Sequence, residues 1–389
     1  MRVLLFTGKG GVGKSTVAAG TAALAAAEGL RTLVVSTDTA HSLGDAFQVG
    51  VGEGPTQVGP HLFVQQVDAQ RQFERSWSEV QRYLREVLDA VGVDPVTADE
   101  LTVLPGAEEV LALLELRTQA LSGHWDVIVV DCAPTAETLR LLALPEALGW
   151  YMRRLFPVER RVVKALRPVL SRAAGIPMPQ DPVFDAVERL YAELSEVQHL
   201  LSGPQASVRL VLTPERMVVA EARRAWTTLS LYGYRVDGVV VNRVFPDEGA
   251  DAWREGWVRA QREVLEEVRD SFGDLTRWTS PYRASEPLGV EALRDVARDL
   301  YGATDALAPA GGVDPFRVEV VDGGGVLHLA LPWADRADVD LARSADVLVI
   351  THGSYRRVLT LPSVLARMQV RGASVRDGEL RVRFAEEET

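Results

Sequence analysis

The stretch RVLLFTGKGGVGKST, residues 2–16, decides the fold of this 389-residue chain. An apolar run from Arg2 to Thr7 is followed at once by a glycine-rich loop and then by an alanine-rich segment that reaches Glu28. An apolar strand, a GxxxxGK[ST] loop and a helix, in that order, are typical of a phosphate-binding loop, because backbone amides and the helix dipole both favour anions. We therefore expect this loop to bind the phosphates of a nucleotide.

The motif predicts a role for each part of the loop. Lys14 is expected to reach the β- and γ-phosphates of ATP, and the hydroxyl group of Ser15 to bind Mg²⁺. Backbone N–H groups of the loop would surround the β-phosphate. The expected nucleotide-binding residues of the loop are Gly8, Gly10, Gly11, Val12, Gly13, Lys14, Ser15 and Thr16.

A second lysine, Lys9, lies in the same loop, although the general motif does not require it. A side chain at this second loop position points away from the phosphates of its own loop. We therefore expect this side chain to contact the nucleotide of a second subunit across a twofold axis. This interpretation predicts a homodimer, whereas the alternative interpretation is a solvated loop lysine.

Two aspartates follow other apolar runs. Asp38 follows residues 31–37, where a carboxylate can orient the water that attacks the γ-phosphate. Asp131 ends the run VIVVD and can hold Mg²⁺ through water. Apolar strands that alternate with helices predict an α/β fold with a doubly wound, mostly parallel sheet. The expected strands are residues 2–7, 31–37, 61–67, 125–130, 208–213 and 236–242.

The alternation of strands and helices also predicts the domains. Residues 68–123 and 146–203 contain helical patterns without strands, and we interpret them as insertions into an ATPase domain that spans residues 1–301. The Gly/Pro-rich run 302–314 predicts a linker. Short strands separated by the turn sequences DGGG and RDGE then predict an all-β sandwich over residues 315–389.

These motifs together resemble a known family. The loop, the two aspartates, VVVNR (239–243) and SPYRASEPLGVEAL (280–293) occur in the order found in arsenite-pump ATPases and in the guided-entry ATPases that target tail-anchored proteins. The resemblance covers residues 1–305. The loop is similar to the deviant Walker A signature of that family, KGGxGK[ST], which belongs to ATPases that dimerise around two nucleotides.

The resemblance implies roles for individual residues. The catalytic residues would be Lys9 as the intermonomer lysine, Lys14, and Asp38 in switch I. The metal-binding residues would be Ser15 and Asp131, with Asp131, Pro134 and Thr135 in switch II, and the adenine would be held by Asn242 and the backbone near Pro281.

The chain departs from the family pattern at three places. Thr39 occupies the usual position of a switch I proline, and Ala136 lies in a switch II sequence, DCAPTAE, that lacks the typical threonine and glycine. No CxxC motif exists, because Cys132 is the only cysteine. The chain therefore lacks the zinc clip of the eukaryotic targeting factor and a cysteine set for arsenite, which disfavours an arsenite-pump subunit. We expect Cys132 to be a small packing residue.

Residues 146–201 occupy the place where targeting ATPases form an apolar groove for a client's transmembrane segment. Their apolar side chains exceed what one buried helix face requires, and arginines are available at a possible rim. The resemblance thus implies a hydrophobic protein segment as client and a membrane receptor. The alternative is an ordinary helical subdomain that packs on the sheet or on a dimer partner. The rim arginines are Arg153, Arg154, Arg160 and Arg161.

The tail resembles the α-crystallin domain of small heat-shock proteins. The resemblance covers residues 315–385 and depends on ADVLVITHGSYRRVLTLP (345–362) and GASVRDGELRVRF (372–384). Such a sandwich could hold exposed apolar segments or an edge strand of another subunit. The alternative is a structural cap on the ATPase domain.

Composition narrows the remaining choices. The net charge of −12 argues against non-specific nucleic-acid binding, which needs a basic surface. The chain begins without the pattern of a signal peptide and contains no run of 18 apolar residues, so we expect a cytoplasmic protein. We expect a homodimeric, MgATP-hydrolysing ATPase that moves a hydrophobic-binding surface. An anion (arsenite) pump subunit, a positioning or partitioning ATPase and a nucleotide-binding scaffold are the alternatives.

Overall fold

The structure is a computed structural model of the whole chain. It describes all residues except 38–41, 53, 67–106, 134, 136–137, 140–141, 144–151, 153–180, 250, 309–313, 322 and 387–389. The chain forms two compact units. The first comprises Met1–Gln66, Gly123–Arg140 and Leu200–Thr389, and the second comprises Val67–Ser122 and Leu141–His199.

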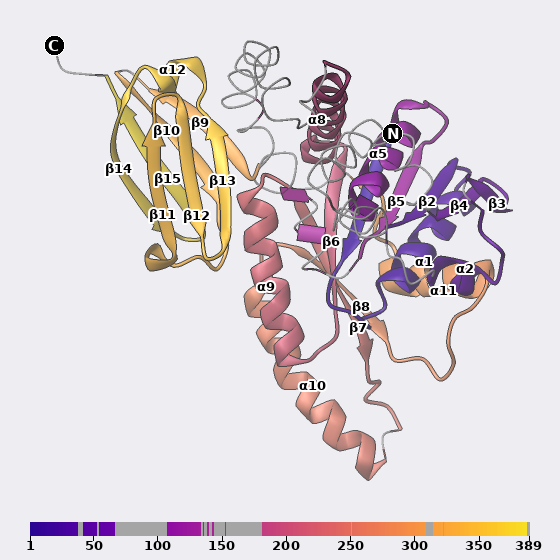
Figure 1. Cartoon of the computed structure of the whole chain (residues 1–389). Helices are drawn as coiled ribbons and strands as arrows, with labels where there is room; N and C mark the ends of the chain where they lie inside the picture. The colour runs from indigo at the N-terminus through magenta and orange to yellow at the C-terminus, as the bar shows by residue number, and fades with distance from the viewer. Residues whose placement is uncertain are drawn as a thin grey trace, which may run out of the picture. The chain divides into compact units, whose positions relative to one another are not determined.

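An eight-stranded sheet is the centre of the first unit (Figure 1), with strand order β3-β4-β2-β5-β1-β6-β7-β8. Neighbouring strands are parallel except for β3 and β4, which are antiparallel. This confirms the predicted mostly parallel, doubly wound sheet. The strands are β1 (Arg2–Thr7), β2 (Thr32–Ser36), β3 (Thr56–Gly59), β4 (Leu62–Gln66), β5 (Val127–Asp131), β6 (Ala206–Leu212), β7 (Val236–Val244) and β8 (Thr276–Pro281).

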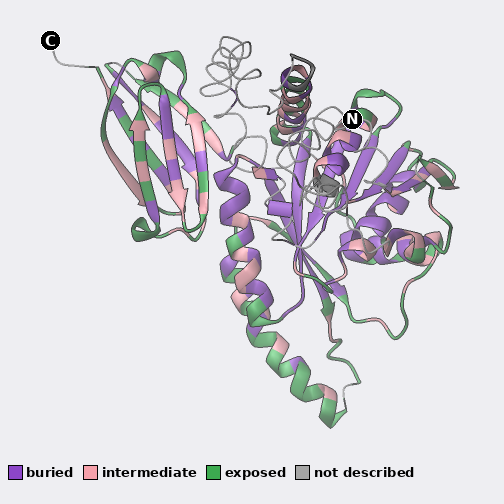
Figure 2. Ribbon diagram, viewed as in Figure 1, coloured by how far each residue is buried: buried purple, intermediate pink, exposed green. Residues whose placement is uncertain are grey.

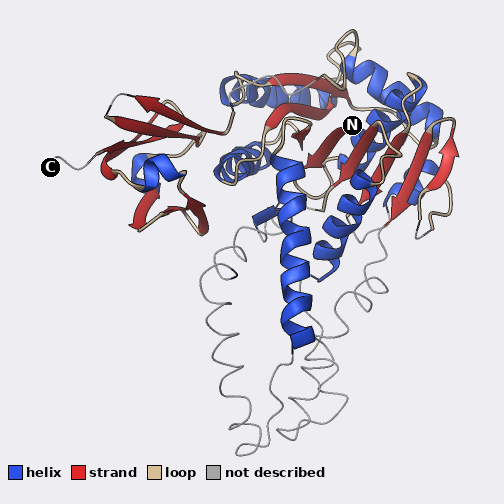
Figure 3. Ribbon diagram, turned by 90° about the horizontal axis from the view of Figure 1, so that it is seen from above, coloured by secondary structure: helices blue, strands red, loops and turns tan. Residues whose placement is uncertain are grey.

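Helices pack against this sheet, as Figure 3 shows in a view from above. Helix α1 contacts β1, β2 and β5, and α9 contacts β6 and β7. The central strands are buried along their whole length, which explains their continuous apolar sequences. The helices of this unit are α1 (Lys14–Ala27), α2 (Ser42–Phe47), α9 (Arg216–Leu231), α10 (Ala252–Ser271) and α11 (Val290–Tyr301).

Close packing between α1 and α11 fixes the helix that follows the glycine loop. A Cβ atom at Gly20 would lie 2.6 Å from the carbonyl oxygen of Leu293, so the two helices approach closely only because this position is glycine. Thr21 of α1 and Tyr301 of α11 share a hydrogen bond of 2.7 Å between their hydroxyl oxygens. The position of α1 therefore depends on α11.

A buried arginine extends this contact. The guanidinium group of Arg209 donates to the Tyr301 hydroxyl at 3.0 Å and to the Asp237 carboxylate at 3.1 Å. It also donates to the carbonyl oxygen of Ala306 at 2.9 Å. Ala306 is itself buried, so the described start of the predicted linker packs against the sheet.

The C-terminal part of the first unit is a two-sheet sandwich, with strand orders β14-β15-β10-β9 and β11-β12-β13. Its core comes from alternate residues of both sheets, which Figure 2 shows as buried. Its elements are β9 (Phe316–Val321), β10 (Gly324–Ala330), η1 (Arg336–Asp338), β11 (Val339–Ser344), β12 (Val347–His352), β13 (Tyr355–Thr360), α12 (Ser363–Ala366), β14 (Gln369–Arg376) and β15 (Glu379–Ala385).

The sandwich contacts the end of helix α9. Leu231, the last residue of α9, belongs to the buried core of the sandwich. Its carbonyl oxygen accepts a hydrogen bond of 2.6 Å from the buried Arg357 side chain. The indole N–H of Trp333 donates to the carbonyl oxygen of Ser271 at 3.1 Å. The sandwich therefore shares both apolar and polar contacts with the ATPase part of its unit.

The second unit is described mainly by two helices, α5 (Ala107–Leu121) and α8 (Asp181–Ser202). The Arg117 guanidinium and the Glu196 carboxylate form an ion pair of 2.6 Å between these helices. The described parts of the predicted insertions are helical, apart from the loop that follows α5. The remainder of residues 68–123 and 146–203, including the four rim arginines, lies outside the described residues.

Candidate nucleotide-binding site

The glycine loop between β1 and α1 has a backbone that other residues could not adopt without strain. Gly11 and Gly13 have φ angles of 81° and 92°, in the left-handed region that favours glycine. A Cβ atom at Gly8 would lie 2.0 Å from the carbonyl oxygen of Val211 in β6. Helix α1 has no side-chain cap and no acidic residue in its first turn, so its N-terminal amides can bind an anion.

Lys14 begins α1 and is 6% exposed. Its ammonium group lies 3.5 Å from the carbonyl oxygen of Lys9, at the long limit for a hydrogen bond. The side chain thus lies against its own loop, where it is held weakly enough to exchange this oxygen for a phosphate. Ser15 and Thr16, also in the first turn, are partly buried.

Lys9 is partly exposed on the loop. The structure contains one chain, so the expected role of Lys9 across a subunit interface stays a prediction.

Asp131 ends β5 and is fully buried. It pairs with Phe6 of β1 and with Ser36 of β2, so it lies where both neighbouring strands reach their carboxyl ends. The glycine loop follows β1 at this same edge of the sheet. A metal bound beside the phosphates would therefore lie near Asp131.

The chain beyond Asp131 contacts the chain beyond β2. The amide of Thr37 donates to the carbonyl oxygen of Asp131 at 3.0 Å, and the amide of Ala133 donates to the Thr37 hydroxyl at 3.2 Å. Thr135 is buried at this end of the sheet. Asp38, Thr39, Pro134 and Ala136 lie outside the described residues, so the predicted role of Asp38 stays untested.

A pocket of about 370 Å³ opens beside the loop and includes the residues predicted to hold the adenine. Asn242 donates from its side-chain amide to the carbonyl oxygen of Val12 at 2.8 Å. Because a Cβ atom at Gly13 would lie 2.3 Å from this amide nitrogen, glycine is needed for the contact. The pocket is lined by Gly13, Thr16, Asn242, Arg243, Val296 and residues 280–287.

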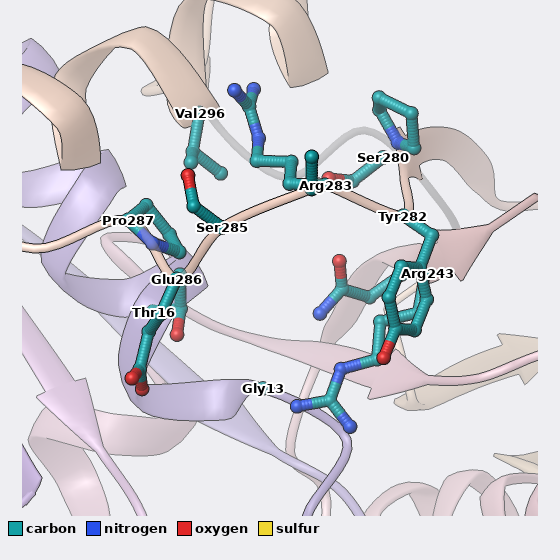
Figure 4. A pocket seen from close by; sticks show the side chains of 13 residues that line it. Gly13, Thr16, Arg243, Ser280, Tyr282, Arg283, Ser285, Glu286, Pro287 and Val296 are labelled. Carbon is teal, nitrogen blue, oxygen red and sulfur yellow. The ribbon is translucent and has the colours of Figure 1, made fainter.

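Figure 4 shows two sides of this pocket, with Arg243 and Tyr282 on one side and Thr16, Glu286 and Pro287 on the other. The amide of Tyr282 donates to the carbonyl oxygen of Val244 at 2.8 Å.

The sequence analysis missed Arg243, Tyr282 and Glu286. The Tyr282 ring stacks on Phe245, with ring centroids 5.0 Å apart and 10° between the ring planes. Arg243 has a φ angle of 59°, unusual for a residue other than glycine. Arg243 and Tyr282 directly follow the predicted Asn242 and Pro281, so adjacency in sequence was the available signal.

The donor atoms near the loop fit MgATP. The loop provides backbone amides and the Lys14 ammonium group for phosphate oxygens. The Ser15 hydroxyl and the Asp131 carboxylate are oxygen donors, the kind that Mg²⁺ prefers. Among the described residues no group of three or more His, Cys, Asp or Glu could hold a metal by itself.

The parallel sheet, the glycine loop at the start of α1 and the aspartate at the end of β5 together define a P-loop nucleoside triphosphatase. Comparison with known proteins identifies the family. The family model described as Anion-transporting ATPase (ArsA ATPase) matches residues 1–302. A second model, described as an HSP20-like domain found in ArsA, matches residues 322–384. The chain therefore belongs to the ArsA ATPase family, is an ATPase, and carries a C-terminal HSP20-like domain.

Relatives match along nearly the whole chain. "Putative arsenical pump-driving ATPase 1" of Aquifex aeolicus is 33% identical over 98% of this chain and 99% of its own length. "Putative arsenical pump-driving ATPase" of Chlorobaculum tepidum is 36% identical over 99% of this chain and 96% of its own length. An uncharacterized protein of Streptomyces coelicolor is 40% identical over 99% of this chain and 97% of its own length. The two-domain organisation is thus shared.

The part of the chain that the structure describes contains no helix long and apolar enough to cross a membrane. Its cysteine, Cys132, is buried next to Asp131. Burial, and secondarily the neighbouring Asp131 carboxylate, raise the pKa of the Cys132 thiol to about 12. This fits the expected packing role of Cys132, because the thiol is neither exposed nor ionised.

Proposed function

We propose that the chain is a homodimeric, MgATP-hydrolysing ATPase that couples dimer closure around the nucleotide to the binding of a hydrophobic protein segment. The observation that carries this proposal is the glycine loop at the start of α1, with Lys14 lying against it and Asp131 at the same edge of the sheet. The client would be a segment such as a transmembrane helix, delivered to a membrane receptor.

The residues at the loop would each have a different role at the phosphates. Lys14 would leave the carbonyl oxygen of Lys9 and bind the β- and γ-phosphates, where its charge offsets the charge that develops during phosphoryl transfer. Ser15 and Asp131 would hold Mg²⁺, the first directly and the second through water. Bound Mg²⁺ would supply charge neutralisation at the phosphate oxygens. Asp38 would orient the attacking water.

Asn242 would recognise the base. Its amide nitrogen donates one of its two hydrogens to Val12, and its side-chain oxygen can accept a hydrogen bond from the base. The exocyclic amino group of adenine is a donor, whereas guanine presents a carbonyl oxygen at that position. The pocket beside Asn242 would therefore favour ATP over GTP, with the backbone near Pro281 closing it.

Dimer closure would complete the site through Lys9. The Lys9 side chain is partly exposed, and its carbonyl oxygen accepts from Lys14 of the same chain. A second subunit facing this loop would bring its own Lys9 toward the γ-phosphate. Closure would then depend on ATP, because ADP lacks that phosphate.

Helix α8 supports the part of the proposal that concerns a hydrophobic client. Leu194 and Val197, toward its C-terminal end, are buried, whereas Val187, Leu190 and Tyr191 are only partly buried. Phe184 packs with Met152 in a small separate cluster. Val187 and Tyr191 pack against this cluster, so Leu190 is the partly exposed apolar position of α8 that could line a client surface.

A peptide-retention assay tests this proposal. A fluorescent peptide with one transmembrane segment is mixed with the protein in ADP, and in Mg²⁺ with a non-hydrolysable ATP analogue. We expect retention to differ at least about tenfold between the two states, the size of a typical coupling free energy. The matched control is a peptide of equal length with four leucines replaced by lysine. Failure to retain the apolar peptide in either nucleotide would contradict the client proposal.

Driving an anion pump is a second candidate, favoured by the family description and by the names of two relatives. The buried thiol of Cys132, the only cysteine in the chain, makes arsenite an unsuitable allosteric ligand. Stimulation of ATP turnover by arsenite, abolished in Cys132→Ser, would favour the pump over the client.

A further inference from the structure

Strand β9 is an open edge of the sandwich. It pairs with β10 on one side and lies at the end of its sheet, with no described strand on the other side. It has no proline and no register irregularity. Val320 and Val321 are 61% and 47% exposed. An apolar edge strand of this kind is a template for pairing with another chain.

The ladder between β9 and β10 shows which backbone groups are available. The amide of Ala330 donates to the carbonyl oxygen of Pro315 at 2.8 Å, one step beyond the Phe316–Leu329 pair. Because hydrogen-bonded pairs alternate along an antiparallel ladder, Phe316, Val318 and Val320 direct their N–H and C=O groups to the open edge. All three can donate, since none is proline.

We infer that β9 pairs with β9 of a second copy of this chain, antiparallel and centred on Val318. In this register Phe316 lies opposite Val320 of the second copy, and Val318 lies opposite Val318. Both are hydrogen-bonded pairs, so the three available residues of each strand are all used. The two four-stranded sheets become one continuous sheet around a twofold axis.

Charge complementarity selects this register. Arg317 then lies opposite Glu319 of the second copy, twice, in the closer non-hydrogen-bonded pairs. Within one chain these two side chains form an ion pair of 3.9 Å and are 44% and 57% exposed, so each can exchange this partner for the one across the axis. A shift by two residues in one direction sets Arg317 opposite Arg317, and in the other direction Glu319 opposite Glu319. Like charges directly opposite each other destabilise a pair of strands.

The apolar face of β9 agrees with the same register. Phe316 and Val318 pack against the sandwich core, whereas Val320 on that face extends beyond it and is largely exposed. Pairing sets Phe316 of the second copy beside Val320. The exposed valine would therefore be covered by the side chain that lies opposite it.

Two other edge strands of the sandwich are protected in ways that β9 is not. Strand β14 carries an irregularity between Val370 and Gly372, which interrupts a regular edge. In β13, the carbonyl oxygen of Arg356 accepts a hydrogen bond from the Tyr232 hydroxyl at 3.3 Å. The open edge of β9 is therefore better suited to a second copy than the edges of β13 and β14.

Two cysteine variants of the full chain test the register. Val318→Cys brings two thiols together across the axis, with Cα atoms about 5.5 Å apart, within the range of a disulfide. Val320→Cys is the matched control, because its two Cα atoms would lie about 14 Å apart, four residues along the strand. The native Cys132 is buried. We expect the intermolecular disulfide to form at least tenfold faster in Val318→Cys than in Val320→Cys, although position 320 is the more exposed.

The inference would be overturned if both variants formed the intermolecular disulfide at the same rate, or if neither variant formed it. A second measurement uses Val320→Pro, which removes an edge donor and leaves the ladder to β10 intact. Analytical ultracentrifugation without nucleotide should give a dimer for the wild type and a monomer for Val320→Pro, and the variant should keep the circular dichroism spectrum of the wild type. A monomeric wild type, including one that binds an extended apolar peptide at β9, would contradict it.

This dimer does not depend on the proposed function. It forms without nucleotide and should persist in Lys9→Ala, whereas closure around ATP should be lost in that variant. If experiment disproves either the β9 interface or the closure around ATP, the other can still be tested.

Discussion

Lys14 is the residue on which the chemistry of the loop most depends. Lys14 is nearly buried and its ammonium group contacts the Lys9 carbonyl oxygen at 3.5 Å, so a phosphate can replace that contact at small cost. Asn242 fixes the opposite side of the loop through Val12. The sequence motif predicted both residues, but only the structure shows the hydrogen bond that joins Asn242 to the loop.

Lys14→Ala should reduce ATP turnover by about 100-fold or more, because one charge that stabilises the transition state is lost from a protected site. Steady-state phosphate release measures this. The melting temperature without nucleotide should change little, since the lost contact is long and weak. Turnover within about twofold of the wild type would contradict the assigned role.

Cys132 should be unreactive in the folded protein. Burial raises the pKa of its thiol to about 12, so almost no thiolate exists at pH 8. A chromogenic disulfide reagent should label no thiol per folded chain and one per chain in denaturant. A Met217→Cys variant, at a position that is 75% exposed, should label readily and is the control for reagent activity. Rapid labelling of the native chain at pH 8 would show that Cys132 is accessible.

At the level of elements, apolar patterns predicted most strands but not those at the margins. The six predicted strands of the large sheet are present, and in β1, β2, β5 and β6 every residue is buried. Strands β3 and β8 were missed, since β8 buries only Trp278 and Ser280 within a polar sequence. These strands owe their structure to neighbours that no local pattern reveals.

Helix α1 should be sensitive to added volume at its contact with α11. Gly20→Ala brings a Cβ atom to 2.6 Å from the Leu293 carbonyl oxygen, so the helices must separate, at a cost of about 1–3 kcal/mol. Thermal unfolding monitored by circular dichroism measures this. Gly256→Ala in α10 is the matched control, because nothing lies within 4 Å and alanine should stabilise that helix. Equal melting temperatures for the two variants would contradict the close packing.

Glu379 of β15 should make the stability of the sandwich depend on acid pH. Burial alone would raise the pKa of Glu379, but hydrogen bonds from Arg381, His328 and Arg317 outweigh it and lower the pKa to about 2. The ionised form is therefore favoured in the folded state. Its contribution is present above the ordinary pKa of about 4.5 and is lost as the pH falls toward 2.

Melting curves from pH 7 to pH 2 check this dependence. Glu379→Gln should melt below the wild type at pH 7, and the difference should shrink between pH 4.5 and pH 2. Glu386→Gln, at an exposed position after β15, is the control and should melt with the wild type at pH 7. A difference that grows as the pH falls would contradict the assignment.

At the scale of the whole molecule, the chain joins an ATPase domain to an HSP20-like domain. The sequence predicted this pairing from motifs in each part. It did not reveal that Leu231 of α9 completes the core of the sandwich, because this contact joins residues more than 90 positions apart. It also could not show which strand edges are open, since that depends on the order of strands in the sheet.

In the proposed homodimer, two subunits complete each nucleotide site. The Lys9→Ala and Lys14→Ala proteins should each be nearly inactive alone. Lys9→Ala removes the lysine that each subunit supplies to its partner's site, whereas Lys14→Ala removes the lysine of the subunit's own loop. In a mixed dimer, the Lys14→Ala subunit supplies Lys9 to the intact loop of its partner.

The most direct measurement is therefore ATP turnover in an equimolar mixture of the two variants. Half of the dimers are mixed and half of their sites are complete, so turnover should recover to about one quarter of the wild-type value per chain. A mixture that turns over no faster than the mean of the two variants would contradict the shared site.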